Sequence, residues 1–351
     1  MSEKKNLLKQ NLIKKMFEDF SIQKKIYKPT IFWKNASKKL YQFFYKKEIT
    51  NFKRYFLINN YFVPLYNLKK EYNIQKMLKL VKKINVSKKL LFSIRDLVEG
   101  KSHALSDYRV FKAADIVKKL PILNDFTETN LGNPLEQFQF GKKKFSRSSL
   151  NYLLGLVFLK NCTKKFIPRV TLEIGGGYGA LGEIIGFSRI KKFKYINVDL
   201  PTQAYVTEMY LSKLFGAEKV TSYITTRKMN IINIKKLKNF TSLVSWQIEM
   251  LKGKIDLFVN FISFQEMEPN VVKNYLDIVS RLKPNYILLR NLREGKNLKK
   301  GKIVGVEKPI KSQYYINTLK KNYSILNRNV IPFGFKTLDN FNSELLIFKK
   351  I

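Results

Sequence analysis

A glycine-rich run that follows an acid has the residue types that point most directly to ligand binding. Glu173 is followed by Gly175, Gly177 and Gly179, with apolar segments on either side. Glycine adopts positive φ and lets a ligand approach the peptide plane without a Cβ in the way. The run therefore predicts a short buried strand, a ligand-binding turn and the first turn of a helix.

A second acid, Asp199, ends the next β-rich segment, 194–199. An acid at the end of the second strand of such a unit can accept both hydroxyl groups of a ribose. Asp199 is therefore expected to contact a nucleotide-like cofactor. It can also cap the helix that is expected to start near Pro201, and the two roles are compatible.

Two other interpretations of the glycine run have to be weighed. The spacing of Gly175, Gly177 and Ala180 also fits the relaxed dinucleotide fingerprint, whose glycines admit a pyrophosphate. A turn without a ligand is disfavoured, because five glycines within 175–182 are costly unless something needs the space. A phosphate-binding P-loop is excluded, since no Gly-Lys-Ser/Thr follows at the required distance. Glu173 and Gly179 favour S-adenosylmethionine over a dinucleotide.

The spacing from Glu173 to Gly179 resembles motif I of the class I S-adenosylmethionine methyltransferases. Over about 130–290 the chain resembles, in outline, the sugar O-methyltransferases found with bacterial surface-polysaccharide genes. The residues 263–267, Ser-Phe-Gln-Glu-Met after a strand, are the most specific part of this resemblance. The resemblance rests on four segments in order, namely Gly132-Asn133-Pro134 with Phe138 to Ser146, Leu150 to Leu159, Leu172 to Gly179 with Val198 to Pro201, and Asp256 to Pro269.

The resemblance implies methyl transfer from S-adenosylmethionine to a sugar hydroxyl. The fourth strand, 255–261, would end beside the sulfonium, since ligands of open α/β sheets lie outside the carboxyl ends of the strands. Gln265 and Glu266 are expected to bind the acceptor, whereas Glu268 is expected to start a helix. The residues expected to bind the cofactor are Glu173, Gly175, Gly177, Tyr178, Gly179, Asp199, Leu200, Asn260 and Ser263.

The reaction needs a group that removes one proton from the acceptor hydroxyl. Glu266 is one candidate, because it follows the strand that faces the sulfonium. His103 is the other, because imidazole has the right unperturbed pKa for proton removal near neutrality. His103 is expected in a polar break between helices, 99–103, where an ordinary surface role is equally compatible with the sequence.

The alternation of strand and helix signals after residue 148 predicts the frame that positions these residues. We expect an α/β fold with a Rossmann-like class I methyltransferase sheet, mostly parallel with an antiparallel C-terminal strand. Residues 1–130 are expected to form a mainly helical region that binds the acceptor or acts as a lid, and 131–351 the methyltransferase domain. The expected elements are strands at 170–174, 194–199, 241–246, 255–261 and 285–290, a hairpin of 323–333 with 343–349, and helices at 75–86 and 148–159.

The composition limits the partners. The net charge is +41, and 56 of the 67 basic residues are lysines. This lysine bias is typical of A/T-rich coding, and bidentate recognition of nucleic acid favours arginine, so a specific nucleic-acid partner is disfavoured. An anionic membrane surface or a lipid-linked acceptor is compatible with the charge. A single cysteine, Cys162, and a single histidine leave no cluster for zinc, and a cytoplasmic location is expected.

Two further functions stay open at this point. The first is an RNA methyltransferase that uses the basic N-terminal region as an electrostatic footprint. Its Asn/Asp-Pro-Pro-Tyr/Phe motif is missing at the end of the fourth strand, where 260–263 reads Asn-Phe-Ile-Ser. The second is a glycan-binding protein with a vestigial site, which the intact Glu173, glycines and Asp199 disfavour. The sequence does not indicate an oligomeric state.

Overall fold

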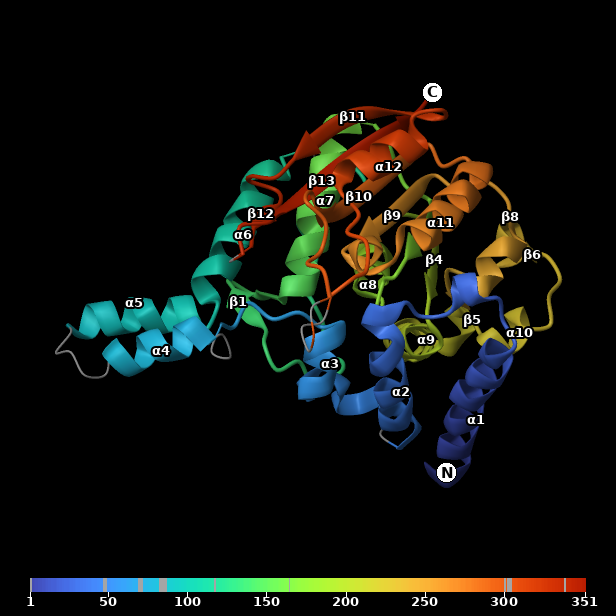
Figure 1. Cartoon of the computed structure of the whole chain (residues 1–351), viewed down its shortest axis with the longest axis horizontal. Coiled ribbons are helices and arrows are strands. Elements are labelled where there is room, and N and C mark those ends of the chain that lie inside the picture. The colour runs from blue at the N-terminus through green and yellow to red at the C-terminus, as the bar shows by residue number, and fades with distance from the viewer. Residues whose placement is uncertain are drawn as a thin grey trace.

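The computed structural model describes most of the chain, and Figure 1 shows its arrangement. A central sheet carries helices on both faces, and an N-terminal helical region lies at one end of it. The described residues are 2–46, 49–68, 72–81, 87–116, 118–163, 165–299, 301, 305–337 and 339–351.

Nine strands of the described residues form the central sheet, in the order β11-β13-β10-β9-β3-β4-β7-β5, with β12 paired to β13. The strands from β10 to β5 in this order are parallel, whereas β13 is antiparallel to both β10 and β11. This is the expected methyltransferase sheet with its closing hairpin. The strands are β3 Val170–Ile174, β4 Lys194–Asp199, β5 Val220–Thr221, β7 Phe240–Val244, β9 Leu257–Phe261, β10 Tyr286–Leu292, β11 Tyr323–Asn329, β12 Phe335–Lys336 and β13 Asn342–Lys350.

Alternate residues of each central strand enter the hydrophobic cores on opposite faces of the sheet. In β9, Leu257, Val259 and Phe261 pack on one face, and Phe258 packs on the other. This period of two is the geometry of a strand, and burial on both faces explains why the parallel strands read as continuous apolar runs. The helices of the first face are α7 Arg147–Thr163, α8 Ala180–Phe187 and α9 Pro201–Phe215, and those of the second are α11 Pro269–Leu282 and α12 Ser312–Leu319.

The N-terminal region is mainly helical, as expected, and it shares its core with the sheet. Met16 of α1 and Leu40 of α2 are fully buried in the same cluster as Leu211 of α9. An ion pair joins Asp19 to Arg227, with 2.8 Å between Oδ1 and Nη2. The helices are α1 Ser2–Ser21, α2 Ile31–Lys46, α3 Phe56–Tyr61, α4 Tyr72–Val81, α5 Lys88–Val98 and α6 Lys101–Ala114, with a single turn at Ile49–Arg54 between α2 and α3.

The observed elements differ from the expected ones in a few places. The strands expected at 241–246, 255–261 and 285–290 correspond to β7, β9 and β10, and each expected end differs from the observed end by at most two residues. The loop-like stretch before α7 contains a short hairpin, β1 Phe138–Phe140 with β2 Lys143–Phe145, which the sequence does not predict. The helix expected over 75–86 begins at Tyr72, and its part beyond Val81 lies outside the described residues.

The remaining described elements are short. They are two strands, β6 Ile232–Asn233 and β8 Leu251–Lys252, the helix α10 Tyr223–Thr226 and several single 3-10 turns. None of the described helices is both long and apolar enough to cross a membrane.

Candidate active site

A cavity of about 270 Å³ lies at the carboxyl ends of β3, β4 and β9. The order of the strands reverses between β3 and β9, and such a switch point is where ligands of open α/β sheets bind. One wall comes from the sheet and its loops, including the turn 175–177, and the opposite wall from the N-terminal region, including Trp33 and 59–62. A narrower apolar lobe adjoins the cavity and shares Asp199 and Leu200 with it.

The glycine turn has the backbone that the sequence predicts. Gly175 and Gly177 have φ values of 75° and 64°, which residues with a Cβ rarely adopt. A Cβ on Gly175 would stand 2.1 Å from the Oγ of Ser263, and one on Gly177 would stand 3.4 Å from the Cβ of Phe62. The backbone of the turn therefore lies close to Ser263 on one wall and to Phe62 on the other. Gly179 has φ 93° and begins α8, outside the cavity lining.

Asp199 lies at the end of β4 with its carboxylate at the junction of the cavity and the narrow lobe. Its Oδ2 accepts the backbone N–H of Gly177 at 3.0 Å, and its Oδ1 accepts the N–H of Leu200 at 2.8 Å. Burial raises the pKa of Asp199 to about 7; these two bonds oppose that rise, and the nearby Glu266 adds to it. A carboxylate has about four acceptor sites, so two remain for a ligand.

Glu173 does not line the cavity, which corrects the expectation that it binds the cofactor directly. Its side chain is fully buried and accepts the hydroxyls of Tyr152 at 2.6 Å and Tyr195 at 2.5 Å. A Cβ on Gly176 would stand 2.4 Å from its Oε2. Burial raises the pKa of Glu173 to about 7. The residue therefore supports the glycine turn from beneath.

The segment after β9 brings Ser263 into the cavity lining but not Asn260 or Gln265. Asn260 is fully buried, and its Nδ2 donates to the carbonyl of Ile174 at 2.9 Å and to the Oγ of Ser263 at 2.6 Å. Gln265 accepts the N–H of Leu292 at 2.7 Å. Both amides tie the ends of neighbouring strands together, so their expected ligand contacts are corrected to positioning roles.

Backbone strain occurs at the same segment. Ile262, the residue between β9 and Ser263, has φ 70° and lines the cavity. A β-branched residue in this conformation is a genuine outlier, and such strain concentrates at functional sites.

Glu266 lines the cavity and is held from both walls. Its Oε1 lies 2.6 Å from the Nζ of Lys296, and its Oε2 accepts the indole N–H of Trp33 at 3.1 Å. The hydroxyl of Thr30 donates to the backbone carbonyl of Glu266 at 3.1 Å. The arrangement fixes the carboxylate at the cavity edge and leaves further acceptor sites on it.

His103 lies on α6, outside the segments that form the cavity. It is exposed in the first turn of α6 and not in a break between helices, because the break ends at Gly100, the residue before that helix. The residues that line the cavity do not include it. The structure therefore does not bring His103 together with Glu266 in the cavity lining, and its role as a base stays a prediction.

Several cavity residues were missed by the sequence analysis. Buried side-chain amides of Asn59 and Gln203 have no hydrogen-bond partner on either atom among the described residues, and the Oδ1 of Asn151 also has none. An unpaired buried amide is costly, so a ligand that pairs with these groups would stabilise them. Gln203 follows Asp199 by one helical turn, which is a signal in the sequence; Asn59 and Asn151 have none that we recognise.

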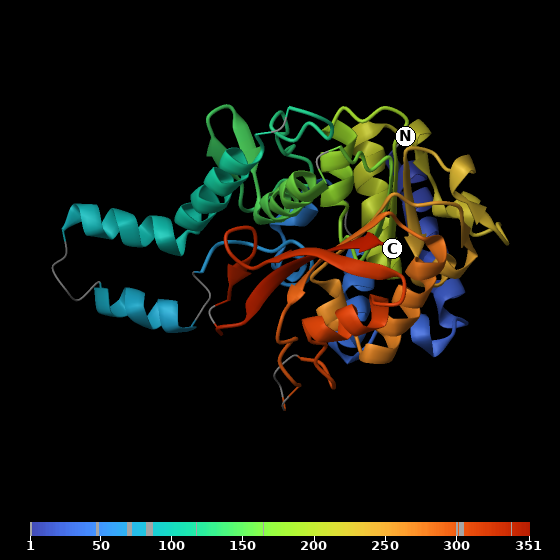
Figure 2. The same cartoon turned by 90° about the horizontal axis from the view of Figure 1, so that it is seen from above.

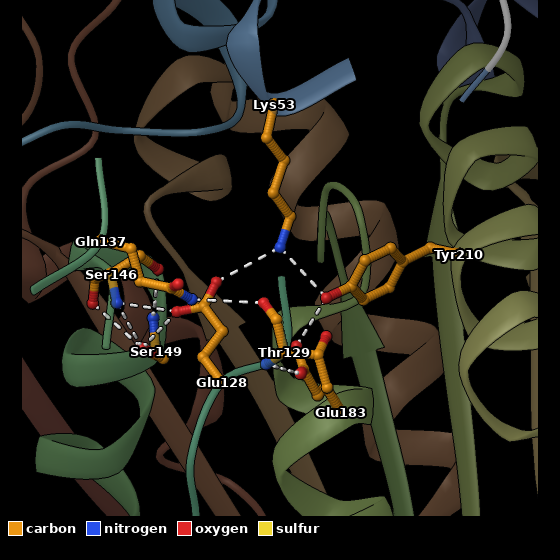
Figure 3. Close-up of polar contacts among 8 residues, drawn as sticks. All are labelled: Lys53, Glu128, Thr129, Gln137, Ser146, Ser149, Glu183 and Tyr210. Atoms are coloured by element: carbon orange, nitrogen blue, oxygen red, sulfur yellow. Dashed lines mark hydrogen bonds and ion pairs between the residues drawn. The ribbon is translucent and has the colours of Figure 1, made fainter. Parts of the chain in front are cut away.

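Figure 3 shows a network of buried polar contacts centred on Lys53, Glu128 and Tyr210. The Nζ of Lys53 lies 3.2 Å from Oε1 of Glu128 and 3.1 Å from the hydroxyl of Tyr210, which donates to Glu183 at 2.7 Å. The same ammonium stands 4.2 Å from the ring centre of Tyr178 in the turn. Tyr178, an expected cofactor contact, is among the residues that line the cavity, while its ring packs against Phe52 and Tyr210 of this network.

The charges of this network do not balance. Lys53 faces two carboxylates, and burial raises the pKa of Glu183 although Lys53 opposes the rise. Glu128 also accepts the backbone N–H of Ser146 at 2.7 Å and the hydroxyl of Ser149 at 2.8 Å. The network thus joins the N-terminal region, the start of α7 and α8–α9 behind the cavity.

The groups that line the cavity fit the cofactor that the sequence resemblance implies. Asp199 offers two acceptor sites for a pair of ribose hydroxyls, and the adjoining lobe is lined by Tyr27, Val271 and Tyr275, which suit a flat ring. On the other side, the glycine turn and the unpaired amide of Gln203 suit a polar tail. S-adenosylmethionine has these parts in this order.

The comparisons with known proteins add a fold-level likeness. No protein-family model matches the chain, and neither does any curated protein. Among solved structures, a SAM-dependent methyltransferase from Aquifex aeolicus is similar at 14% identity, over 59% of this chain and 94% of that one, with a TM-score of 0.38.

Two other solved structures are comparable. Magnesium protoporphyrin IX methyltransferase from Synechocystis PCC 6803, crystallised with SAM, is similar at 10% identity over 58% of this chain and 81% of that one, with a TM-score of 0.38. Mitomycin 7-O-methyltransferase is similar at 8% over 76% of this chain and 59% of that one, with a TM-score of 0.36. At such values the likeness carries no argument about activity, and the assignment of the fold rests on the strand order.

Proposed function

We propose that this chain is an S-adenosylmethionine-dependent O-methyltransferase whose acceptor is a sugar hydroxyl of a surface glycan or its precursor. The observation that carries the proposal is that one cavity at the switch point of the sheet is lined by the glycine turn, Asp199 and Glu266 together. The carboxylate expected to accept the ribose hydroxyls of the cofactor and the candidate base thus face the same cavity.

The cofactor supplies an activated methyl group on a sulfonium, so the protein has mainly to align the acceptor and remove one proton. In the proposed complex Asp199 accepts the ribose hydroxyls. The backbone of 175–177 lies against the methionine part, with Leu200 beside the ribose. The apolar lobe next to Leu200 excludes water from the ring system.

Glu266 is the proposed base for the acceptor hydroxyl. Lys296 and Trp33 hold its two oxygens, which fixes the carboxylate in one orientation at the cavity edge. A carboxylate held in this way can accept the hydroxyl proton as that proton is released. Glu266 then passes the proton to solvent.

The remaining lining of the cavity suits an uncharged, hydroxyl-rich acceptor. Trp33 and Tyr61 pack with 5.6 Å between ring centres, and Asn59 and Asn60 lie beside them. Aromatic faces and amides are the groups with which proteins hold sugar rings by apolar contact and hydrogen bonds. The sugar is the finer part of the proposal, and its support comes from this lining and from the resemblance of 130–290.

The experiment is to incubate the full chain with methyl-labelled S-adenosylmethionine and three acceptor pools: surface-glycan extract, lipid-linked glycan precursors and total RNA. The proposal predicts base-stable label in a glycan pool, recovered as an O-methyl sugar after hydrolysis. Label only in RNA would replace the proposal with the RNA methyltransferase. No label in any pool, with S-adenosylmethionine bound, would support the glycan-binding alternative.

A further inference from the structure

Two helices project from the body of the molecule. α4 and α5 form an arm that extends away from the sheet and its covering helices in both views (Figures 1 and 2). The carboxyl end of α5 is fixed to the body, because the carbonyl of Val98 accepts the N–H of Leu68 at 2.9 Å. Gly100, with φ 81°, then lies against Tyr66, where a Cβ would stand 2.4 Å away. The arm is therefore held at its base.

The arm exposes large apolar side chains that a folded monomer normally buries. The exposed fractions of Leu90, Leu91 and Leu97 are 48%, 45% and 40%, and that of Phe92 is 60%. Positions 90, 91, 94 and 97 lie on one side of an α-helix, so three of these leucines share a face with Ile94. Leu80 of α4 is exposed by 54%. A contiguous apolar surface that is exposed to solvent indicates a binding site for a partner.

The same arm is strongly basic. The two helices contain five lysines and arginines, at positions 76, 79, 88, 89 and 95, against one acidic residue, Asp96. At the carboxyl end of α5, Asp96 pairs with Lys101 at 3.4 Å and Arg95 pairs with Glu99 at 3.2 Å, which leaves the four lysines of the two helices as the excess charge. Lys88 and Lys89, at the free end of α5, are exposed, and no ion pair is found for either among the described residues.

We propose that the α4–α5 arm docks on an anionic membrane surface. A helix with an apolar face flanked by lysines lies in the interface of such a membrane, with its leucines among the acyl chains and its ammonium groups at the headgroups. The choice of occupant follows from charge complementarity. A second copy would bring an equally basic arm on a chain of net charge +41, so two arms repel each other, whereas acidic headgroups attract them.

The first experiment measures sedimentation of the full chain with vesicles of phosphatidylcholine containing 30 mol% phosphatidylserine, and with vesicles of phosphatidylcholine alone. The expected result is binding to the anionic vesicles that is at least about 10-fold stronger than binding to the neutral ones and that weakens with added salt. Equal binding to both, or binding to neither, overturns the proposal.

A pair of matched variants tests the role of the lysines. Lys88→Gln with Lys89→Gln removes two positive charges from the arm, and Lys235→Gln with Lys236→Gln removes two from an exposed turn of the body. The arm pair is expected to weaken vesicle binding about 10- to 30-fold and the body pair less than about 3-fold. Equal weakening by both pairs means that overall charge acts and not the arm, and it overturns the proposal.

A second pair tests the apolar face. Leu90→Ser with Leu91→Ser is compared with Ile231→Ser with Ile331→Ser, whose side chains are exposed by 61% and 70% outside the arm. Because all four side chains are exposed, thermal unfolding should be unchanged in both variants. Only the leucine pair is expected to reduce vesicle binding. A dimer in solution that the leucine pair dissociates, with vesicle binding unchanged, assigns the face to a second copy and overturns the proposal.

Discussion

The two walls of the cavity differ in how their polar groups are satisfied. On the sheet wall, Glu173, Asn197 and Asn260 are fully buried, and each makes at least two hydrogen bonds to the strands, helices or loops around the glycine turn. Elsewhere around the cavity, Asn59 on the opposite wall and Gln203 near the start of α9 are buried without partners on either amide atom among the described residues. The polar groups beneath the glycine turn are satisfied without a ligand, whereas these two amides are left for one.

This difference separates the fold from ligand binding. The sheet wall shapes the turn before a ligand arrives, so changes there should affect stability and affinity together. The facing wall carries a desolvation cost in the free protein, so changes there should affect affinity while leaving stability unchanged or raised.

The largest effect is expected where the two walls meet. Glu266→Gln keeps the shape of the side chain and removes the charge that Lys296 and Trp33 hold. Turnover on the true acceptor should fall about 10²- to 10⁴-fold, while S-adenosylmethionine affinity changes little, because the group acts mainly in the transition state. Labelled methyl transfer and calorimetry measure the two quantities.

His103→Ala is the matched control for that prediction. His103 is exposed on α6 and does not line the cavity, so turnover should stay within about 2-fold of the wild type. A large loss of turnover in His103→Ala, with Glu266→Gln fully active, would reverse the roles assigned here.

The next effect concerns the glycine turn. Gly175→Ala adds a Cβ 2.1 Å from the Oγ of Ser263 at φ 75°, whereas Gly141→Ala adds one at φ 62° with nothing within 4 Å. Gly141→Ala should cost about 1 kcal/mol of unfolding free energy from the backbone alone. Gly175→Ala should cost about 1–3 kcal/mol more, from overpacking, and should also lose cofactor affinity. Equal costs in denaturant unfolding would show that Ser263 does not press on the turn.

The smallest effect is expected when a buried amide with hydrogen-bond partners is compared with one that has none. Asn197→Leu removes an amide that accepts the N–H of Gly176 at 3.1 Å and donates to Thr207 at 3.0 Å, so stability should fall by about 1–3 kcal/mol. Gln203→Met removes an amide without partners, so the unfolding free energy should stay level or rise by about 1 kcal/mol, while cofactor affinity falls. A comparable loss of stability in both variants contradicts the contrast.

Much of the sheet wall could be predicted from sequence, because local patterns dictate it. The strand expected at 170–174 is β3, and Gly175, Gly177 and Gly179 have the positive φ that the sequence predicts. Element type follows from periodicity and turn chemistry, which are local. The direction of a side chain is less local. Glu173 and Asn260 were expected in the ligand site and instead tie the strands beneath it.

The facing wall could not be predicted, because it depends on which distant segments meet. Asn59 and Trp33 carry no motif, and only the packing of the N-terminal helices on the sheet places them beside Glu266. Lys53 is a similar case. It has 1% exposure and lies between a carboxylate and two tyrosine rings, although a lysine in a basic sequence is usually a surface residue.

The charge state of Asp199 gives the cofactor site a pH dependence. Its pKa is about 7 in the folded chain against an ordinary 3.8, so the folded state keeps a proton that the unfolded state releases between these values. Its contribution to stability is therefore present below about pH 4 and lost as pH rises to about 7. Ribose hydroxyls donate to the ionised form, so cofactor affinity should rise between pH 6 and 8, and Asp199→Asn should abolish that rise.

A calorimetric titration of the full chain with S-adenosylmethionine, S-adenosylhomocysteine and NAD at pH 8 shows which cofactor the cavity binds. We expect one molecule of either sulfur compound to bind per chain, no binding of NAD, and an affinity about 10- to 100-fold weaker in Asp199→Ala. Binding of NAD without the sulfur compounds, or an unchanged affinity in Asp199→Ala, would contradict the assignment of this cavity.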